Sequence, residues 1–150
     1  MTKTINISYC HCSLDELAAA DRQLVEAAFE ATRQAYAPFS GFRVGAAARL
    51  RSGEIITAAN CESEVFPSGL CAERSLLHYY ATNYATDPIE ALAIASDPSE
   101  RECYPCGACR QVILDAERRQ LSPIRIVMAG GGTATTVESA ESLLPFTFKL

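Results

Sequence analysis

The sequence predicts an α/β fold: a three-layer α/β/α sandwich around a mixed sheet of about five strands. Apolar segments at 89–95 and 124–129 alternate with helical patterns, which is typical of buried, partly parallel strands. Residues 42–60 have the pattern of a β-hairpin, which adds antiparallel pairing. A length of 150 residues predicts a single domain over 1–150, and a hydrophobic content of 49% supplies its core.

The N-terminal part of the chain predicts an arm followed by a helix. Residues 1–12 have the pattern of a loose arm or an edge strand. Ser13 and Glu16 form a capping-box pattern, which predicts that a helix begins directly after Ser13. Leu17, Leu24, Ala28 and Ala35 would lie near one face of this helix, and Pro38 would end it.

The rest of the chain predicts strands alternating with helices. The hairpin comprises FRVGAAARL, a Ser52-Gly53 turn and EIITAAN. The later elements are a loop over 61–69, a helix over 70–84, a strand over 89–95, a helix over 105–119, strands over 124–129 and 133–137, and a short helix over 139–144.

Charge and hydropathy restrict the class of partner. The net charge of -5 argues against a surface that tracks nucleic-acid phosphates, since such binding depends on Lys and Arg. No stretch has the length and apolarity of a membrane span, and the N-terminus lacks the pattern of a secretory signal. We therefore expect a cytoplasmic protein that acts on a small molecule and binds neither membrane nor nucleic acid.

Seven cysteines indicate metal binding or catalysis more than disulfide bonds. Thiols of cytosolic proteins stay mostly reduced, and an odd number fits a closed disulfide framework poorly. Cys106 and Cys109 stand three residues apart at a predicted helix N-terminus, and Cys71 stands at the start of the other helix. Backbone N–H groups and the helix dipole stabilise thiolates at such positions. If the two helix starts face each other, three thiolates converge.

Three protein ligands with a fourth position left open are typical of a catalytic zinc site. Zinc makes water acidic near neutral pH, and Glu73 is well placed to accept the proton. The segments C71-A-E73 and P105-C-G-A-C109 match the three-cysteine form of the zinc deaminase signature. The sequence therefore predicts Zn²⁺ on Cys71, Cys106 and Cys109, with Glu73 as the catalytic acid and base.

Other interpretations of the thiols remain open from the sequence alone. Cys103 could join the three ligands to close a four-cysteine structural zinc site, or the run could hold an iron–sulfur cluster. Neither alternative gives Glu73 a role. We expect no metal role for the Cys10-His11-Cys12 segment, a small hydrophobic role for Cys61, and a structural or surface role for His78.

Four segments together resemble the small, homotetrameric, three-cysteine class of cytidine deaminases. They are YAPFSGFRVGAAARL at 36–50, AANCESEVFPSGLCAER at 58–74, PCGACRQV at 105–112 and LLPFTF at 143–148. The resemblance covers nearly the whole chain, in the same order as in that family. It implies a cytidine deaminase-like fold and one zinc per subunit.

The resemblance also implies roles for individual residues. Asn60 and Glu62 would hydrogen-bond the ribose 3′-hydroxyl, and Phe42 would pack against the pyrimidine. Phe148 would reach the base bound by a neighbouring subunit, and the carbonyl of Ala72 would orient the exocyclic amine. A further residue, Arg74, would hydrogen-bond the zinc thiolates and offset their negative charge.

The expected activity is hydrolytic deamination of cytidine or 2′-deoxycytidine in pyrimidine salvage. Ser63, Glu64 and Phe66 depart from the family pattern, and Leu76 replaces a usual alanine. Glu64 and Phe66 would lie near the 5′ end of the ribose, where they could set specificity. Two alternatives stay open: a deaminase of another aminopyrimidine nucleoside with an altered 5′ group, or a zinc-stabilised binding protein without turnover.

Overall fold

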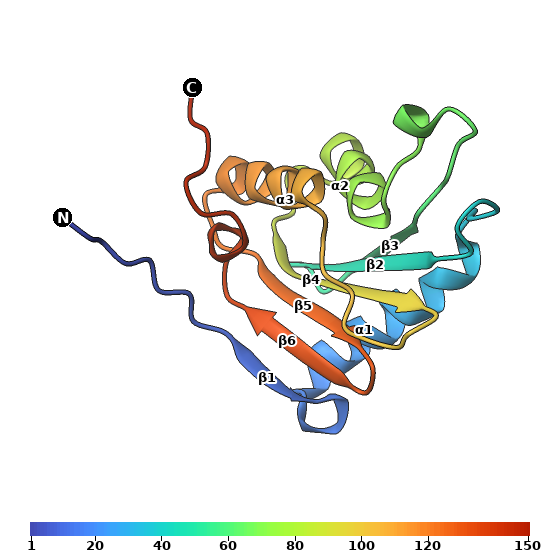
Figure 1. The fold of residues 1–150 in the computed structure, drawn as a ribbon, viewed down its shortest axis with the longest axis horizontal. Coiled ribbons are helices and arrows are strands. Elements are labelled where there is room, and N and C mark those ends of the chain that lie inside the picture. Colours follow the sequence, from blue (N-terminus) through green and yellow to red (C-terminus); the bar gives the residue numbers. More distant parts are fainter.

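Six strands form one mixed sheet in the order β1-β6-β5-β4-β2-β3 in the computed structural model, which describes residues 1–150 (Figure 1). The strands are β1 (Cys10–Ser13), β2 (Arg43–Leu50), β3 (Ile55–Ala59), β4 (Ile89–Asp97), β5 (Arg125–Gly130) and β6 (Thr133–Val137). β4 pairs with β5 in parallel and with β2 antiparallel, and the other strand pairs are antiparallel. This confirms the mixed sheet that the sequence predicts.

Helices cover both faces of the sheet, so the three-layer sandwich is confirmed. The helix α1 (Ala19–Ala31) lies on one face, and α2 (Ala72–Asn83) and α3 (Gly107–Gln120) lie side by side on the other (Figure 1). The two apolar cores match this division. One core joins α2 and α3 to the sheet, with Leu76 and Ile113 among its fully buried residues; the other joins Leu24 and Ala28 of α1 to the opposite face.

Gly45 in β2 allows α1 to pack closely on the sheet. A Cβ atom at this position would lie 1.9 Å from the carbonyl oxygen of Ala28 and 2.9 Å from the backbone nitrogen of Thr32. Both atoms belong to the backbone, so no side-chain movement could make room. The glycine therefore fixes the distance between α1 and β2.

The N-terminal region differs from the prediction in two ways. Residues 10–13 pair with β6, so the edge-strand alternative is confirmed for the end of the predicted arm, and the sheet has six strands where about five were expected. The first long helix begins at Ala19 and not after Ser13, because the Ser13–Glu16 pair caps a separate 3₁₀ turn over Leu14–Glu16. Residues 1–9 extend beyond the sheet without pairing (Figure 1).

The remaining elements lie close to their predicted ranges. The C-terminal helix predicted over 139–144 is a 3₁₀ helix at Ala140–Leu143. None of the helices has the length and apolar character needed to span a bilayer.

Candidate metal centre and active site

The N-termini of α2 and α3 bring three thiols together. Cys71 and Cys106 are the N-cap residues of the two helices, and Cys109 lies in the first turn of α3. Their sulfur atoms all lie within 4.8 Å of one another. The Cys106–Cys109 sulfur distance is 3.4 Å and the Cys71–Cys106 distance is 4.0 Å. The convergence expected from the sequence is present.

The spacing of these sulfurs suits a zinc ion. A tetrahedral site with Zn–S bonds of about 2.3 Å places its sulfurs about 3.8 Å apart. The Cys106–Cys109 distance lies just below that value and the Cys71–Cys106 distance just above it. Cys103 is not a member of the cluster, so the three sulfurs leave one tetrahedral position for another ligand.

Electrostatics favour a thiolate at Cys71. A hydrogen bond from Cys109, together with one from Arg74 at 3.6 Å, lowers the pKa of Cys71 to about 5. Cys109 is buried and donates toward that thiolate, so its own pKa is raised. The same contact stabilises the charged form of Arg74, because its hydrogen bond to Cys71 raises the pKa of the guanidinium.

Glu73 is a buried carboxyl group beside the thiols. Only 3% of the residue is exposed, and burial raises its pKa to about 7. The negative charge of Cys71 acts in the same direction. A carboxyl group with a pKa near neutrality exchanges protons readily at physiological pH, which suits a general acid and base.

Cys103 differs from the three clustered thiols. Burial raises its pKa to about 11, and the nearby carboxylate of Glu73 adds to the effect. It packs against the core formed by α2, α3 and the sheet. Cys103 is therefore a neutral thiol beside the site, and its position gives no support to a closed four-cysteine set.

Asn60 and Glu62 lie beside the thiols but also hold the loop before β2. Both line a small cavity of about 220 Å³ together with Cys71 and Arg74. The amide of Asn60 accepts a hydrogen bond from the Val44 backbone N–H at 2.8 Å and donates to the carbonyl of Phe42 at 3.0 Å. Each amide atom keeps a further hydrogen-bonding position for a ligand.

The carboxylate of Glu62 accepts from the hydroxyl of Ser40 at 3.0 Å and from the Ser40 backbone N–H at 3.2 Å. Ser40 stands two residues before Phe42, and the Phe42 N–H donates to its hydroxyl. Asn60 and Glu62 thus hold the backbone of Phe42 and of the residues next to it in place. The sequence alone did not predict this supporting role.

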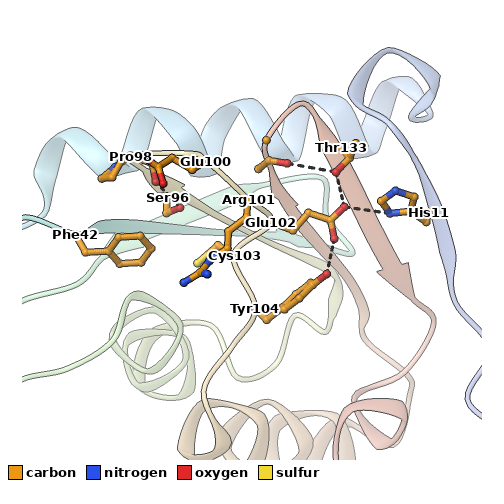
Figure 2. A pocket seen from close by; sticks show the side chains of 12 residues that line it. His11, Phe42, Ser96, Pro98, Glu100, Arg101, Glu102, Cys103, Tyr104 and Thr133 are labelled. Atoms are coloured by element: carbon orange, nitrogen blue, oxygen red, sulfur yellow. Dashed lines mark hydrogen bonds and ion pairs between the residues drawn. The ribbon is translucent and has the colours of Figure 1, made fainter.

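Phe42 lines a larger cavity of about 940 Å³, which lies between the end of β4, the loop that leads to α3 and the turn between β5 and β6 (Figure 2). Cys103 and Ser96 face the same cavity, which extends past Glu102 to His11. The cavity does not include the three clustered sulfurs, so the thiol cluster and not cavity size locates the candidate centre. Sequence reasoning missed Ser96, Glu102 and His11, because no local motif links these three separate segments.

The other predicted residues take various positions. Ala72 is buried in the first turn of α2. Phe148 is 75% exposed in the C-terminal tail, where it lines a small cavity with residues of α3 that does not include the three thiols. Glu64 is exposed on the 61–69 loop, and Phe66, 76% exposed, makes an edge-to-face contact with Phe39.

Comparison with known families decides the classification. The profile described as the cytidine and deoxycytidylate deaminase zinc-binding region matches residues 18–122. The chain belongs to this deaminase family.

Named relatives agree with the deaminase family assignment. A cytidine deaminase from Halalkalibacterium halodurans is 40% identical over 96 residues, covering 63% of this chain and 71% of that protein. A probable cytidine deaminase from Dictyostelium discoideum is 31% identical over 124 residues, covering 83% and 80% of the two chains. The crystal structure of a Burkholderia pseudomallei cytidine deaminase superposes with a TM-score of 0.72 at 34% identity, covering 84% of this chain and 97% of that one.

The deaminase match encloses most of the candidate site. The three thiols, Glu73 and Phe42 lie within residues 18–122. The edge strand β1, the strand β6 and Phe148 lie outside that range.

Proposed function

We propose that this protein is a zinc-dependent hydrolase that converts cytidine or 2′-deoxycytidine and water into the uridine analogue and ammonia. The observation that carries the proposal is a buried Glu73 beside three convergent thiols, in a chain of the deaminase family. A three-thiolate zinc ion supplies a Lewis acid that makes water acidic near neutral pH. The proposal places that ion on Cys71, Cys106 and Cys109.

Glu73 moves the protons in the proposed reaction. Its carboxylate accepts a proton from the water that adds to C4 of the pyrimidine. It gives this proton to N3, then takes the proton of the hydroxyl now on C4 and passes it to the departing amine, so that the C4 carbonyl forms, the C4–N bond breaks and ammonia leaves. The raised pKa of Glu73, about 7, matches a group that must both take and give a proton.

Other side chains bind and orient the substrate. Arg74 donates to Cys71 and offsets the charge of three thiolates, which would otherwise weaken the Lewis acid. Asn60 and Glu62 bind the ribose 3′-hydroxyl with the hydrogen-bonding positions that Phe42 and Ser40 leave free. Phe42 packs against the pyrimidine, and the Ala72 carbonyl orients the exocyclic amine.

The same proposal extends to assembly and location. The protein binds one zinc per subunit and forms a homotetramer in which Phe148 reaches a neighbouring site. It takes part in pyrimidine salvage in the cytoplasm, where thiols stay reduced, and its acidic net charge of -5 argues against nucleic acid as a partner. All seven cysteines are free, which is compatible with a compartment that keeps thiols reduced.

A nucleoside panel tests the proposed activity. Absorbance and ammonia release would be monitored for cytidine, 2′-deoxycytidine and cytosine, with zinc content measured on the same preparation. We expect turnover of the two nucleosides and a much slower reaction of the free base, which lacks the ribose contacts. A folded, zinc-loaded protein that turns over none of them would contradict the proposal and favour the binding-protein alternative.

A further inference from the structure

The loop that leads into α3 is held against the turn between β5 and β6. The Cys103 N–H donates to the carbonyl of Ala129 at 3.1 Å, and the Gly131 N–H donates to the carbonyl of Ser99 at 3.1 Å. A Cβ atom at Gly130 would lie only 2.0 Å from the carbonyl oxygen of Arg101. The loop and the turn therefore meet at backbone contact distance, which only glycine permits at that position.

The carboxylate of Glu102 fastens this loop from the side. Its side chain is 6% exposed although it lines the larger cavity. One oxygen accepts from the Thr133 hydroxyl at 2.7 Å and lies 3.2 Å from Nδ1 of His11. The other accepts from the Tyr104 hydroxyl at 2.8 Å, so the carboxylate joins β1, β6 and the loop (Figure 2).

The chain between this anchor and the metal-binding thiols is short. Only Cys103, Tyr104 and Pro105 separate Glu102 from Cys106, the N-cap residue of α3. Tyr104 is itself bound by Glu102, and Pro105 is buried and restricts the backbone. A displacement of Glu102 would therefore shift the short backbone segment that carries Cys106.

We propose that Glu102 is a positioning residue: with His11 and Thr133 it fixes the loop before α3 and thereby holds Cys106 in register with Cys71 and Cys109. The inference rests on the proposed zinc site. Two of its three partners, His11 on β1 and Thr133 on β6, lie outside the segment that matches the deaminase family. The edge of the sheet thus has a role in metal binding, although none of its residues is a ligand.

Metal retention tests the proposal independently of turnover. Zinc transfer from the full-length protein to a chromogenic chelator would be timed, and the thiolate-to-metal absorption of the Co²⁺-substituted protein would be recorded well below the melting temperature. We expect Glu102→Ala to release zinc about tenfold faster, in line with the 10–100-fold losses seen for residues that orient metal ligands. Its cobalt spectrum should also change, and kcat should fall more than KM rises.

Matched variants separate positioning from general destabilisation. Glu100→Ala removes an exposed carboxylate from the same loop and should release zinc like the unaltered protein. His11→Ala should also release zinc faster, but by a smaller factor than Glu102→Ala. If Glu102→Ala does not fold, the zinc release rate and the cobalt spectrum are measured on Glu102→Gln and His11→Ala instead. An unchanged release rate and cobalt spectrum in folded Glu102 variants would overturn the proposal. If the unaltered protein binds zinc but does not deaminate nucleosides, the release assay still decides the role of Glu102.

Discussion

At the scale of single residues, Cys103 distinguishes an open metal site from a closed one. The sequence allows it as a fourth ligand, but its thiol lies outside the cluster of three and its pKa is raised by burial. An open site can admit a water, whereas four thiolates would fill the coordination of zinc. The hydrolytic proposal therefore depends on Cys103 not being a ligand.

Alanine substitution of each thiol tests this distinction. Cys71→Ala, Cys106→Ala and Cys109→Ala should each lower zinc occupancy strongly, because a two-thiolate site binds zinc far more weakly. Cys103→Ala is the matched control and should keep the zinc content of the unaltered protein. Metal analysis of the four purified variants gives the answer, and loss of zinc from Cys103→Ala would support the closed site instead.

Glu64 carries the second residue-scale prediction, on the 5′ end of the substrate. The structure leaves this carboxylate exposed, so solvent would screen the repulsion of a 5′-phosphate that we propose for it. We expect Glu64→Ala to raise kcat/KM for CMP relative to cytidine about two- to fivefold, the range of exposed charge interactions. The exposed Glu54→Ala serves as the control. If Glu64→Ala leaves the CMP to cytidine ratio unchanged, Glu64 does not select substrates.

Phe66 suggests a companion measurement. The aromatic ring contacts Phe39 and offers no hydroxyl for a substrate 5′-hydroxyl. We therefore expect 5′-deoxycytidine to react within a few-fold of cytidine, since a hydrogen bond of about 0.5–1.5 kcal/mol is missing in both cases. A Phe66→Tyr variant should favour cytidine if the ring reaches the 5′ end. The absence of any gain would remove Phe66 from the substrate contacts.

Residue types with strong local signals were predictable from the sequence, and long-range pairs were not. Cys71, Cys106 and Cys109 stand in short motifs at helix starts, so they meet once two helices cover the same face. Glu102 and His11 are 91 residues apart in the sequence and carry no motif. Their contact depends on β1 pairing with β6, which no local pattern specifies. Local patterns likewise could not predict the hydrogen bonds of Asn60 to the backbone of Val44 and Phe42.

At the scale of elements, the hairpin β2–β3, the strands β4 and β5, and the helices α2 and α3 match the predicted ranges closely. Their apolar patterns extend over long segments, and their ends carry proline, glycine or capping signals. The exception is the start of the chain, where the capping pair Ser13–Glu16 closes a 3₁₀ turn and α1 starts later. A capping box satisfies backbone N–H groups of any short helical turn, so the motif does not fix the length of the helix that it caps.

Gly45 carries the element-scale prediction. Gly45→Ala would force a Cβ atom against the backbone of Ala28 and Thr32, so α1 would have to move away from β2. We expect a loss of about 1–3 kcal/mol in the free energy of unfolding, as for other overpacked interiors. Denaturant unfolding at constant zinc measures it. Gly107→Ala is the control, because a Cβ there meets no atom within 4 Å; equal stability of the two variants would contradict the packing argument.

At the scale of the whole molecule, one sheet connects the N-terminal strand to the thiol-bearing helices, and we propose that residues 1–150 act as a single domain. The C-terminal tail stands apart from this body. Phe146, Phe148 and Leu150 are strongly exposed apolar residues, which fits a surface covered by a second subunit. The homotetramer proposed above would bury them.

Removal of residues 146–150 tests the role of the tail. The deletion takes away only one side-chain hydrogen bond from the body, that of Arg118 to Thr147 at 2.9 Å, so stability should change little. KM for cytidine should rise clearly if Phe148 completes a neighbouring site. Light scattering and steady-state kinetics on the deletion and on Phe148→Ala give the comparison. A fully active monomer in the unaltered protein would contradict the shared site.

Metal binding and proton transfer, we propose, belong to different residues of one site. Glu73→Gln tests this most directly, because the carboxylate lies beside the thiols but is not part of their cluster. Zinc content and kcat for cytidine would be measured on the same preparation of the variant. We predict that zinc stays at the level of the unaltered protein while kcat falls by about 10²–10⁴, the contribution of general acid–base catalysis. Turnover near the rate of the unaltered protein, or loss of the zinc, would contradict this division of roles.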